Sequence, residues 1–166
     1  MKSRILFASI ATTVFCLASI TSLSPVRAQT TPPKIQTKLS LAPQRVQRGR
    51  SVRASVLLDI PAGYHVNAHD PISRFALATK LEVETPKGMR IGRVFYPKAI
   101  VRRFAFSKDR LGVYENHAAI TFTIFVPSQQ PLGAGEVKAR LSYQSCSDEV
   151  CFPPVTRDIA VAITVN

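Results

Sequence analysis

The sequence predicts an all-β protein with the fold of an immunoglobulin-like β-sandwich. Apolar residues alternate with polar ones along several runs, turn-forming residues separate these runs, and no stretch combines a helix cap with an apolar stripe of helical period. An alternation with a period of two gives strands that turn one face toward a core. Several short strands separated by turns are typical of two sheets packed face to face.

The alternating runs predict individual strands. Apolar residues alternate most clearly at 52–60, 118–126, 137–143 and 159–165. Turn signals, many of them with glycine or proline, lie at 47–49, 61–63, 85–88 and 128–135. The segment GYHVN at 63–67 reads as a strand that leads into a turn. We therefore expect a single sandwich domain over residues 36–166, preceded by a flexible tether at residues 29–35.

One stretch, residues 97–116, does not fit the strand pattern. It places Phe104 and Phe106 among charged residues, with only weak alternation. Aromatic side chains in a charged loop either plug the core beneath the loop or cover another group. The residue pattern by itself favours the plug.

The first residues have the features of an export signal. Lys2 and Arg4 give a positive start, residues 5–20 are almost uncharged and mostly apolar, and Val26 and Ala28 supply small residues before a cleavage point. A membrane anchor is the alternative, but the run is shorter than the roughly 20 apolar residues that a spanning helix needs. We expect residues 1–28 to be removed, which leaves an exported, periplasmic protein without a membrane span.

The chain is strongly basic, with 22 Lys and Arg against 10 Asp and Glu. The basic residues are spread along the chain, and export would separate it from nucleic acid. The densest group is Arg45, Arg48, Arg50 and Arg53, which surrounds a glycine-containing turn. A solvated surface explains this charge better than a nucleic-acid site, so no nucleic-acid partner is expected.

Two cysteines remain after removal of the signal, which takes Cys16 with it. Cys146 and Cys151 lie in the segment YQSCSDEVCFPP at 143–154, on either side of a short polar turn. As a structural staple the pair would contribute little, because a ring of about six residues constrains the unfolded chain by roughly 2 kcal/mol. A better staple would close a much longer loop.

A metal site is a second interpretation of the cysteines. A structural zinc ion needs four Cys or His ligands, and the candidates beside the two sulfurs are His65, His69 and His117. Copper(I) would suit the sulfur ligands. Solitary surface histidines are more common than such a cluster, so no metal or other cofactor is expected.

A redox pair is the third interpretation, and it fits the local chemistry best. Exchange needs an accessible sulfur and a second sulfur that resolves the mixed disulfide. Asp148 and Glu149 in the turn would raise the pKa of a neighbouring thiol, or would simply solvate the turn. Pro153 and Pro154 cannot donate backbone hydrogen bonds, so regular strand pairing should stop there.

The same segment resembles the periplasmic amino-terminal domain of the thiol:disulfide interchange protein DsbD. The resemblance is based on Tyr143, Gln144, Cys146, Cys151, Phe152, Pro153 and Pro154. Weaker matches lie at 63–67, 95–97 and 111–116, so that the resemblance spans most of residues 40–165. Four residues separate the cysteines here, whereas the best-known members have five.

The resemblance implies an immunoglobulin-like domain with the cysteines at one end. It implies that Cys151 forms the mixed disulfide with a partner, that Cys146 resolves it, and that an aromatic cap, Phe104 or Phe106, shields the sulfurs. The implied partners are a membrane-embedded thiol reductase and periplasmic thioredoxin-like proteins, and the implied activity is that of a protein-disulfide reductase. Two other functions stay open: a β-sandwich binding module with a structural hairpin disulfide, and a copper-handling protein.

Overall fold

The computed structural model describes residues 31–166, and no helix occurs within them. The expected signal peptide at 1–28 lies outside the described residues. The strands are β1 (Gln36–Ala42), β2 (Arg45–Val46), β3 (Ser51–Asp59), β4 (Tyr64–Asn67), β5 (Lys80–Glu84), β6 (Arg90–Ile91), β7 (Ile100–Arg103), β8 (Arg110–Tyr114), β9 (His117–Phe125), β10 (Gly133–Tyr143), β11 (Ser145–Ser147) and β12 (Val155–Val165). Within residues 31–166 no helix has the length and apolar character needed to cross a membrane.

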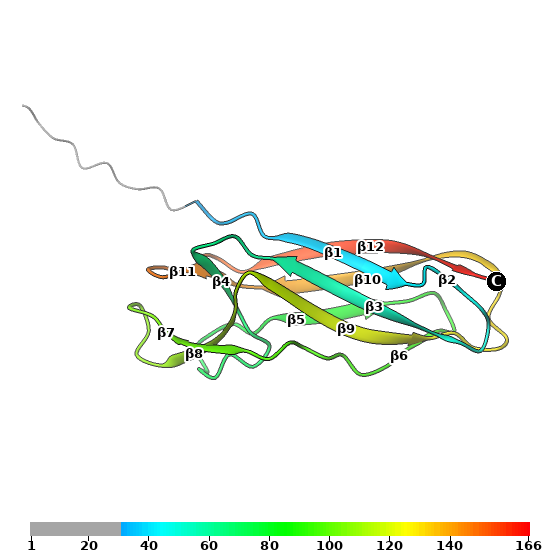
Figure 1. The fold of residues 1–166 in the computed structure, drawn as a ribbon, viewed down its shortest axis with the longest axis horizontal. Coiled ribbons are helices and arrows are strands. Elements are labelled where there is room, and N and C mark those ends of the chain that lie inside the picture. The colour runs from blue at the N-terminus through cyan, green and yellow to red at the C-terminus, as the bar shows by residue number, and fades with distance from the viewer. Residues whose placement is uncertain (1–30) are drawn as a thin grey trace, which may run out of the picture. The chain divides into compact units, whose positions relative to one another are not determined.

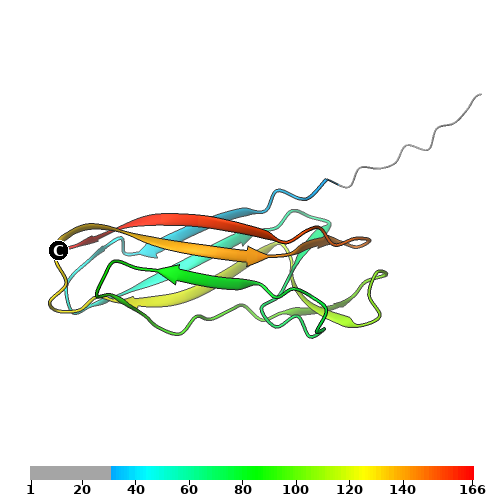
Figure 2. The same ribbon diagram turned by 180° about the vertical axis from the view of Figure 1, so that it is seen from behind.

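Two four-stranded sheets form the sandwich. One has the order β1-β3-β9-β6, and the other has the order β2-β12-β10-β5. Figures 1 and 2, which view the fold from opposite sides, show the first sheet in front in one view and the second in front in the other. The four runs predicted from alternation coincide with β3, β9, β10 and β12. The predicted immunoglobulin-like β-sandwich is confirmed.

The core lies between the facing surfaces of these two sheets. On β3 the side chains of Val52, Ala54, Val56 and Leu58 point inward and are at most 1% exposed. The inward residues of β9 and β10 are at most 3% exposed, and they include Phe122, Ile124 and Leu141. Ile35, the last residue of the expected tether, also packs into this core and is only 4% exposed.

A third sheet, with the order β11-β4-β8-β7, is built at one end of the sandwich. In Figure 1 it lies at the end opposite the C-terminus. Its strands come from distant parts of the sequence, since β4 pairs with both β8 and β11. Both cysteines belong to this end of the molecule.

The interpretation of residues 97–116 as one irregular loop is wrong. Ile100–Arg103 forms β7 and pairs with β8, with Val101 opposite Gly112 and Arg103 opposite Arg110. Only residues 104–109 connect the two strands. The alternation is weak because β7 is an edge strand that exposes all four of its residues, so burial imposes no polar–apolar pattern on it.

Candidate functional site

Cys146 and Cys151 form a disulfide that closes a short hairpin. Their Cα atoms are 3.9 Å apart, and the two residues face each other across an isolated antiparallel bridge. The Ser147 amide donates to the Val150 carbonyl at 2.8 Å, and the Phe152 amide donates to the Ser145 carbonyl at 2.9 Å. The backbone therefore holds the hairpin closed independently of the sulfur bond.

The hydroxyl group of Ser147 organises the turn between the cysteines. Its Oγ accepts hydrogen bonds from the amides of Glu149 and Val150, both at 3.2 Å. The side chains of Asp148 and Glu149 are exposed as a result. These carboxylates belong to the polar turn that was predicted between the two sulfurs.

The two cysteines differ sharply in exposure. Cys146 is 0% exposed, whereas Cys151 is partly exposed. Cys151 also lines a cavity of about 210 Å³ together with Phe75, Phe106 and Gln144. Cys151 is therefore the more accessible of the two cysteines at this end of the domain.

Hydrogen bonds through the side chains of Asn67 and Gln144 hold the segment that carries Cys151. Asn67 donates from Nδ2 to Oε1 of Gln144 at 3.0 Å, and Gln144 donates from Nε2 to the carbonyl of Phe152 at 3.1 Å. The amide of Asn67 also donates to the Gln144 carbonyl at 3.0 Å. Strand β4 is thus linked to both sides of the cysteine hairpin.

The third sheet separates the main core from a smaller apolar cluster. Val66 and Tyr114, on one face, pack into the core of the sandwich. Leu111 and Val113, on the other face, are covered by Phe104, which is 9% exposed. This second face is the one that carries His65, because His65 and Val66 point to opposite sides of β4.

His65 lies directly opposite Cys146 in the β4–β11 ladder. Its ring is 2% exposed and stacks on Phe104, with the ring centroids 4.0 Å apart and the planes 13° apart. Burial lowers the pKa of His65 below its usual value, and the negative charges of Asp148 and Glu115 oppose this effect. Nε2 of His65 is buried and has no hydrogen-bond partner within residues 31–166.

Phe104 and Phe106, the two expected cap residues, have different surroundings. Phe104 belongs to the small apolar cluster, while Phe106 is 37% exposed and lines the cavity at Cys151. Their rings are nearly parallel, with centroids 5.3 Å apart. Phe106 therefore shares a cavity with Cys151, and Phe104 links the 104–109 loop to His65.

Two further loops complete this end of the domain. Ser73 donates from Oγ to Asp109 Oδ2 at 2.8 Å, which joins the 70–79 loop to the 104–109 loop. Phe75 projects from the 70–79 loop and is 76% exposed. Beside them, Arg102 and Glu115 form a two-pronged ion pair at 2.8 and 2.9 Å, which lowers the pKa of Glu115.

Tyr143 and Pro153, two of the expected supporting residues, flank the cysteine hairpin in the sequence. Tyr143 is 3% exposed and packs in the core of the sandwich, and Pro153 is exposed beyond the hairpin. Asn67, Gln144 and Phe75 were not expected as site residues, and His65 was expected only as a possible metal ligand. Two signals were available: Gln144 lies in the cysteine segment, and His65 and Asn67 lie in the weaker match at 63–67.

Of the three histidines, His65 alone lies directly opposite a cysteine in the strand pairing. His69 stacks on Tyr96 and contacts the Thr79 carbonyl through Nδ1, and His117 lies beside Asp59 at 3.2 Å. Within residues 31–166 no three His, Cys, Asp or Glu side chains are grouped so as to hold a metal ion.

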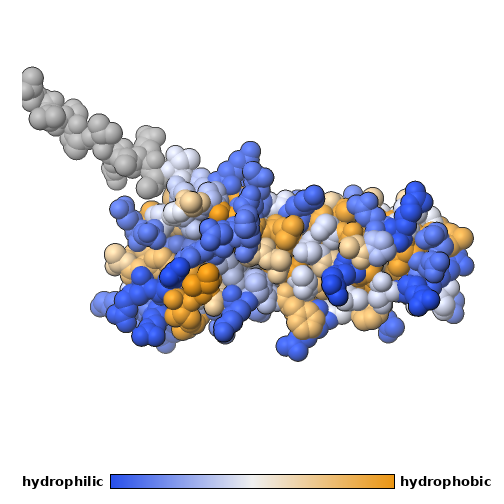
Figure 3. All heavy atoms as spheres, in the orientation of Figure 1, coloured by the Kyte–Doolittle hydropathy of each residue, from blue (hydrophilic) through white to orange (hydrophobic). Residues whose placement is uncertain are grey.

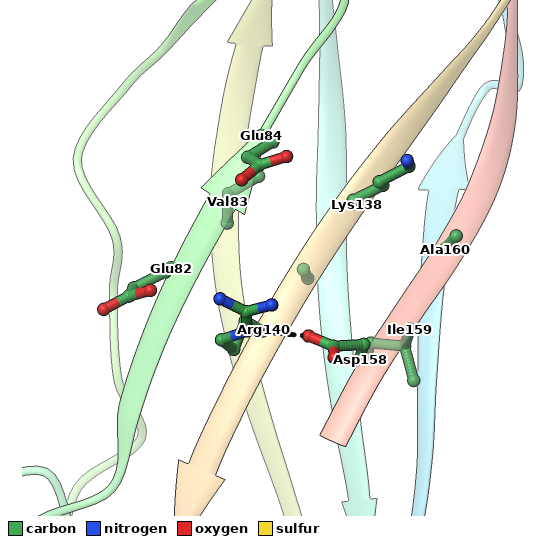
Figure 4. Close-up of a pocket in the computed structure, with 9 residues that line it drawn as sticks. Glu82, Val83, Glu84, Lys138, Arg140, Asp158, Ile159 and Ala160 are labelled. Atoms are coloured by element: carbon green, nitrogen blue, oxygen red, sulfur yellow. Dashed lines mark hydrogen bonds and ion pairs between the residues drawn. The ribbon is translucent and has the colours of Figure 1, made fainter. Parts of the chain in front are cut away.

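A second hollow, of about 470 Å³, lies on the β5-β10-β12 sheet (Figure 4). Its centre is the ion pair between Arg140 and Asp158, at 2.8 Å, with Glu82 and Lys138 nearby. Both partners of this pair are largely exposed, which leaves their charges screened by water. No cysteine lines this hollow.

Comparisons with known proteins point to one family. The family model described as "Thiol:disulfide interchange protein DsbD, N-terminal" matches residues 32–163. No curated protein sequence matches the chain at a significant level. The family match covers most of the chain and includes both cysteines.

Solved structures share the fold. The reduced form of the Neisseria meningitidis DsbD N-terminal domain has a TM-score of 0.51 and 20% identity, and the alignment covers 81% of this chain and 91% of that one. A complex between the DsbD N-terminal and PilB N-terminal domains of the same organism gives a TM-score of 0.50 and 20% identity, with 78% and 85% covered. The N-terminal periplasmic domain of ScsB from Proteus mirabilis has a TM-score of 0.49 and 9% identity, with 76% and 44% covered. With its family match, its β-sandwich and its Cys146–Cys151 disulfide, the chain belongs to the family of DsbD N-terminal domains, which act in thiol-disulfide exchange.

Proposed function

We propose that this domain is a periplasmic exchange module that passes electrons through Cys146 and Cys151. It would accept them from a membrane-embedded thiol reductase and deliver them to exported thioredoxin-like proteins. The observation that carries the proposal is the unequal exposure of the two sulfurs, because a reachable first sulfur and a protected second one are what a two-step exchange requires.

The order of the two steps follows from this difference. Cys151 forms the mixed disulfide with the partner, because it is the sulfur that borders the open cavity. Cys146 then attacks Cys151 and releases the partner. The short hairpin keeps the two sulfurs adjacent during both steps, since its backbone hydrogen bonds do not depend on the disulfide.

Phe106 is the ring that shields Cys151 between encounters. It lines the same cavity, and it lies on the 104–109 loop, which connects two strands at the edge of the third sheet. Phe104 instead anchors this loop by packing on His65, Leu111 and Val113. A partner that displaces Phe106 gains access to Cys151 without disturbing the sandwich.

The periplasmic location rests on the family and on the expected signal peptide at residues 1–28. The DsbD N-terminal domain of Neisseria meningitidis forms a complex with a PilB N-terminal domain, so that relative engages another protein domain. For the chain described here, the partners are proposed to be proteins that carry their own reactive cysteine pair.

A redox titration tests this function. The full exported protein is equilibrated with mixtures of reduced and oxidised glutathione, and the fraction of free thiol is measured after acid quenching. An exchange-active pair is expected to have a reduction potential less negative than about −300 mV, the value below which structural disulfides resist the glutathione pool. A potential well below that value would instead identify a structural disulfide in a binding module.

A further inference from the structure

Three side chains form a row across the cysteine end of the molecule. Cys151 faces Cys146 across the hairpin bridge, and Cys146 faces His65 across the β4–β11 ladder. Residues directly opposite each other in antiparallel strands place their side chains on the same face, with Cβ atoms about 4.5–5.5 Å apart. The imidazole of His65 is thus the titratable side chain next to Cys146 on the neighbouring strand.

The resolving step poses a proton-transfer problem for Cys146. A thiol attacks a disulfide as the thiolate, so Cys146 must lose its proton before or while it attacks Cys151. Cys146 is 0% exposed, which keeps bulk water from accepting that proton directly. A buried acceptor beside the sulfur would remove this obstacle.

His65 has an unused hydrogen-bonding atom in the disulfide form. Its Nε2 is buried and has no partner within the described residues, although buried polar atoms are nearly always paired. Leaving such an atom unpaired is costly, so its presence calls for an explanation. A disulfide carries no proton to donate, whereas the thiol that Cys146 becomes on reduction does.

We propose that His65 is the proton acceptor for the Cys146 thiol in the resolving step, an inference that rests on the exchange function proposed above. Sγ of Cys146 forms a bond with Sγ of Cys151, and the bond between Cys151 and the partner sulfur breaks. The electron pair of that bond leaves with the partner sulfur as a thiolate, and the Cys146 proton moves to the imidazole of His65. When the domain is reduced again, the proton returns to Cys146.

The surroundings of His65 suit this role. Burial under Phe104 lowers the pKa of His65, which keeps the ring neutral and able to accept a proton at neutral pH. The carboxylates of Glu115, after β8, and Asp148, in the cysteine turn, stabilise the imidazolium that forms. Arg102 of β7 forms an ion pair with Glu115, and its positive charge weakens the effect of the Glu115 carboxylate on His65.

The test separates the two chemical steps of exchange. The reduced full-length exported protein is mixed with dithiobis(nitrobenzoate), and the release of thionitrobenzoate is followed by stopped flow. Attack by Cys151 releases the first equivalent, and resolution by Cys146 releases the second. His65→Phe keeps a flat ring against Phe104 but removes both ring nitrogens, and His117→Phe is the matched control at an exposed site.

We expect His65→Phe to leave the first release within about twofold of the native rate and to slow the second at least tenfold at pH 7. In the native protein the second release should slow once the pH falls far enough to protonate His65, which requires a pH below the usual imidazole value of about 6.5 because burial lowers the pKa of this ring. In His65→Phe it should instead rise about tenfold per pH unit until the thiol itself ionises. A purely structural role would not change the pH profile in this way.

His65→Gln guards against a folding defect, because its amide accepts a hydrogen bond but does not take up a proton at these pH values, and the same slowing is expected. A second release that keeps its native rate and pH profile in folded His65→Phe or His65→Gln would overturn the role of His65 and leave the exchange function standing. Failure of the native protein to give a second release would overturn the exchange function itself.

Discussion

Truncation of Phe106 tests whether its ring shields Cys151, the more accessible of the two cysteines. The ring keeps 37% of its surface exposed and lines the cavity that contains Cys151. Full burial of such a side chain is worth roughly 1.5–3 kcal/mol, and about two thirds of the ring is buried here. Phe106→Ala is therefore expected to lower the free energy of unfolding by about 1–2 kcal/mol while opening the cavity at Cys151.

Phe104→Ala should behave differently, because Phe104 is only 9% exposed and packs on Leu111 and Val113. Removing a buried phenylalanine typically costs about 3–5 kcal/mol. Since Phe104 lies over His65 and not in the cavity at Cys151, the reactivity of Cys151 should change less. Phe104→Ala should therefore lose more stability than Phe106→Ala, whereas Phe106→Ala should gain more reactivity at Cys151.

The assay combines denaturant unfolding with the rate at which iodoacetamide alkylates Cys151 in the reduced protein, measured by mass spectrometry. Phe125→Ala is the matched control, because Phe125 is 43% exposed on β9 of the β1-β3-β9-β6 sheet, outside the third sheet that carries the cysteines. Apolar side chains occur elsewhere on the surface too, since Figure 3 shows them mixed with polar ones on the face seen in that view. We expect severalfold faster alkylation in Phe106→Ala and the native rate in Phe125→Ala. Equal rates in these two variants would refute the shielding role of Phe106.

Two further predictions concern stability. Reduction of the disulfide should lower the free energy of unfolding by no more than roughly 2 kcal/mol, since the ring is small and the hairpin keeps its backbone hydrogen bonds. Melts of the oxidised and reduced protein measure this difference. A reduced form that is unfolded at room temperature would contradict the prediction. The free energy of unfolding should also fall on acidification. In the unfolded chain His and Glu side chains take up protons below about pH 6.5 and 4.3, but the folded state lowers the pKa of both His65 and Glu115 and so binds fewer protons. Stability should therefore decline first below about pH 6.5 and again below about pH 4.3. His65→Phe should remove the first decline, and an unchanged pH profile in that variant would show that His65 is not its source.

The sequence was informative where one face of a strand is buried. Alternation identified β3, β9, β10 and β12, because these long strands turn every second residue toward the core. It could not identify β7, whose residues are all exposed, or the two-residue strands β2 and β6. Short or fully exposed strands carry no periodic pattern for a reader to detect.

The site was predictable only in part for a related reason. The cysteine segment is local and its residues were recognisable, but the position of His65 depends on the pairing of β4 with β11, which are about 80 residues apart. Alternation reports which residues face inward and says nothing about which strands become neighbours. Phe104 and Phe106 could likewise be named as a pair, while their different roles emerged only from their burial and contacts.

The most direct test of electron exchange traps the mixed disulfide with each cysteine in turn. Cys146→Ala leaves the partly exposed Cys151 without a resolving thiol, and it should accumulate a covalent adduct with exported thiol-disulfide proteins that reductant releases. Cys151→Ala leaves only the buried Cys146, and it should trap far less. Non-reducing electrophoresis followed by mass spectrometry of the adducts measures both. Equal trapping by the two variants would contradict the assigned order of the cysteines, and no adduct with either would contradict thiol-disulfide exchange as the function of this domain.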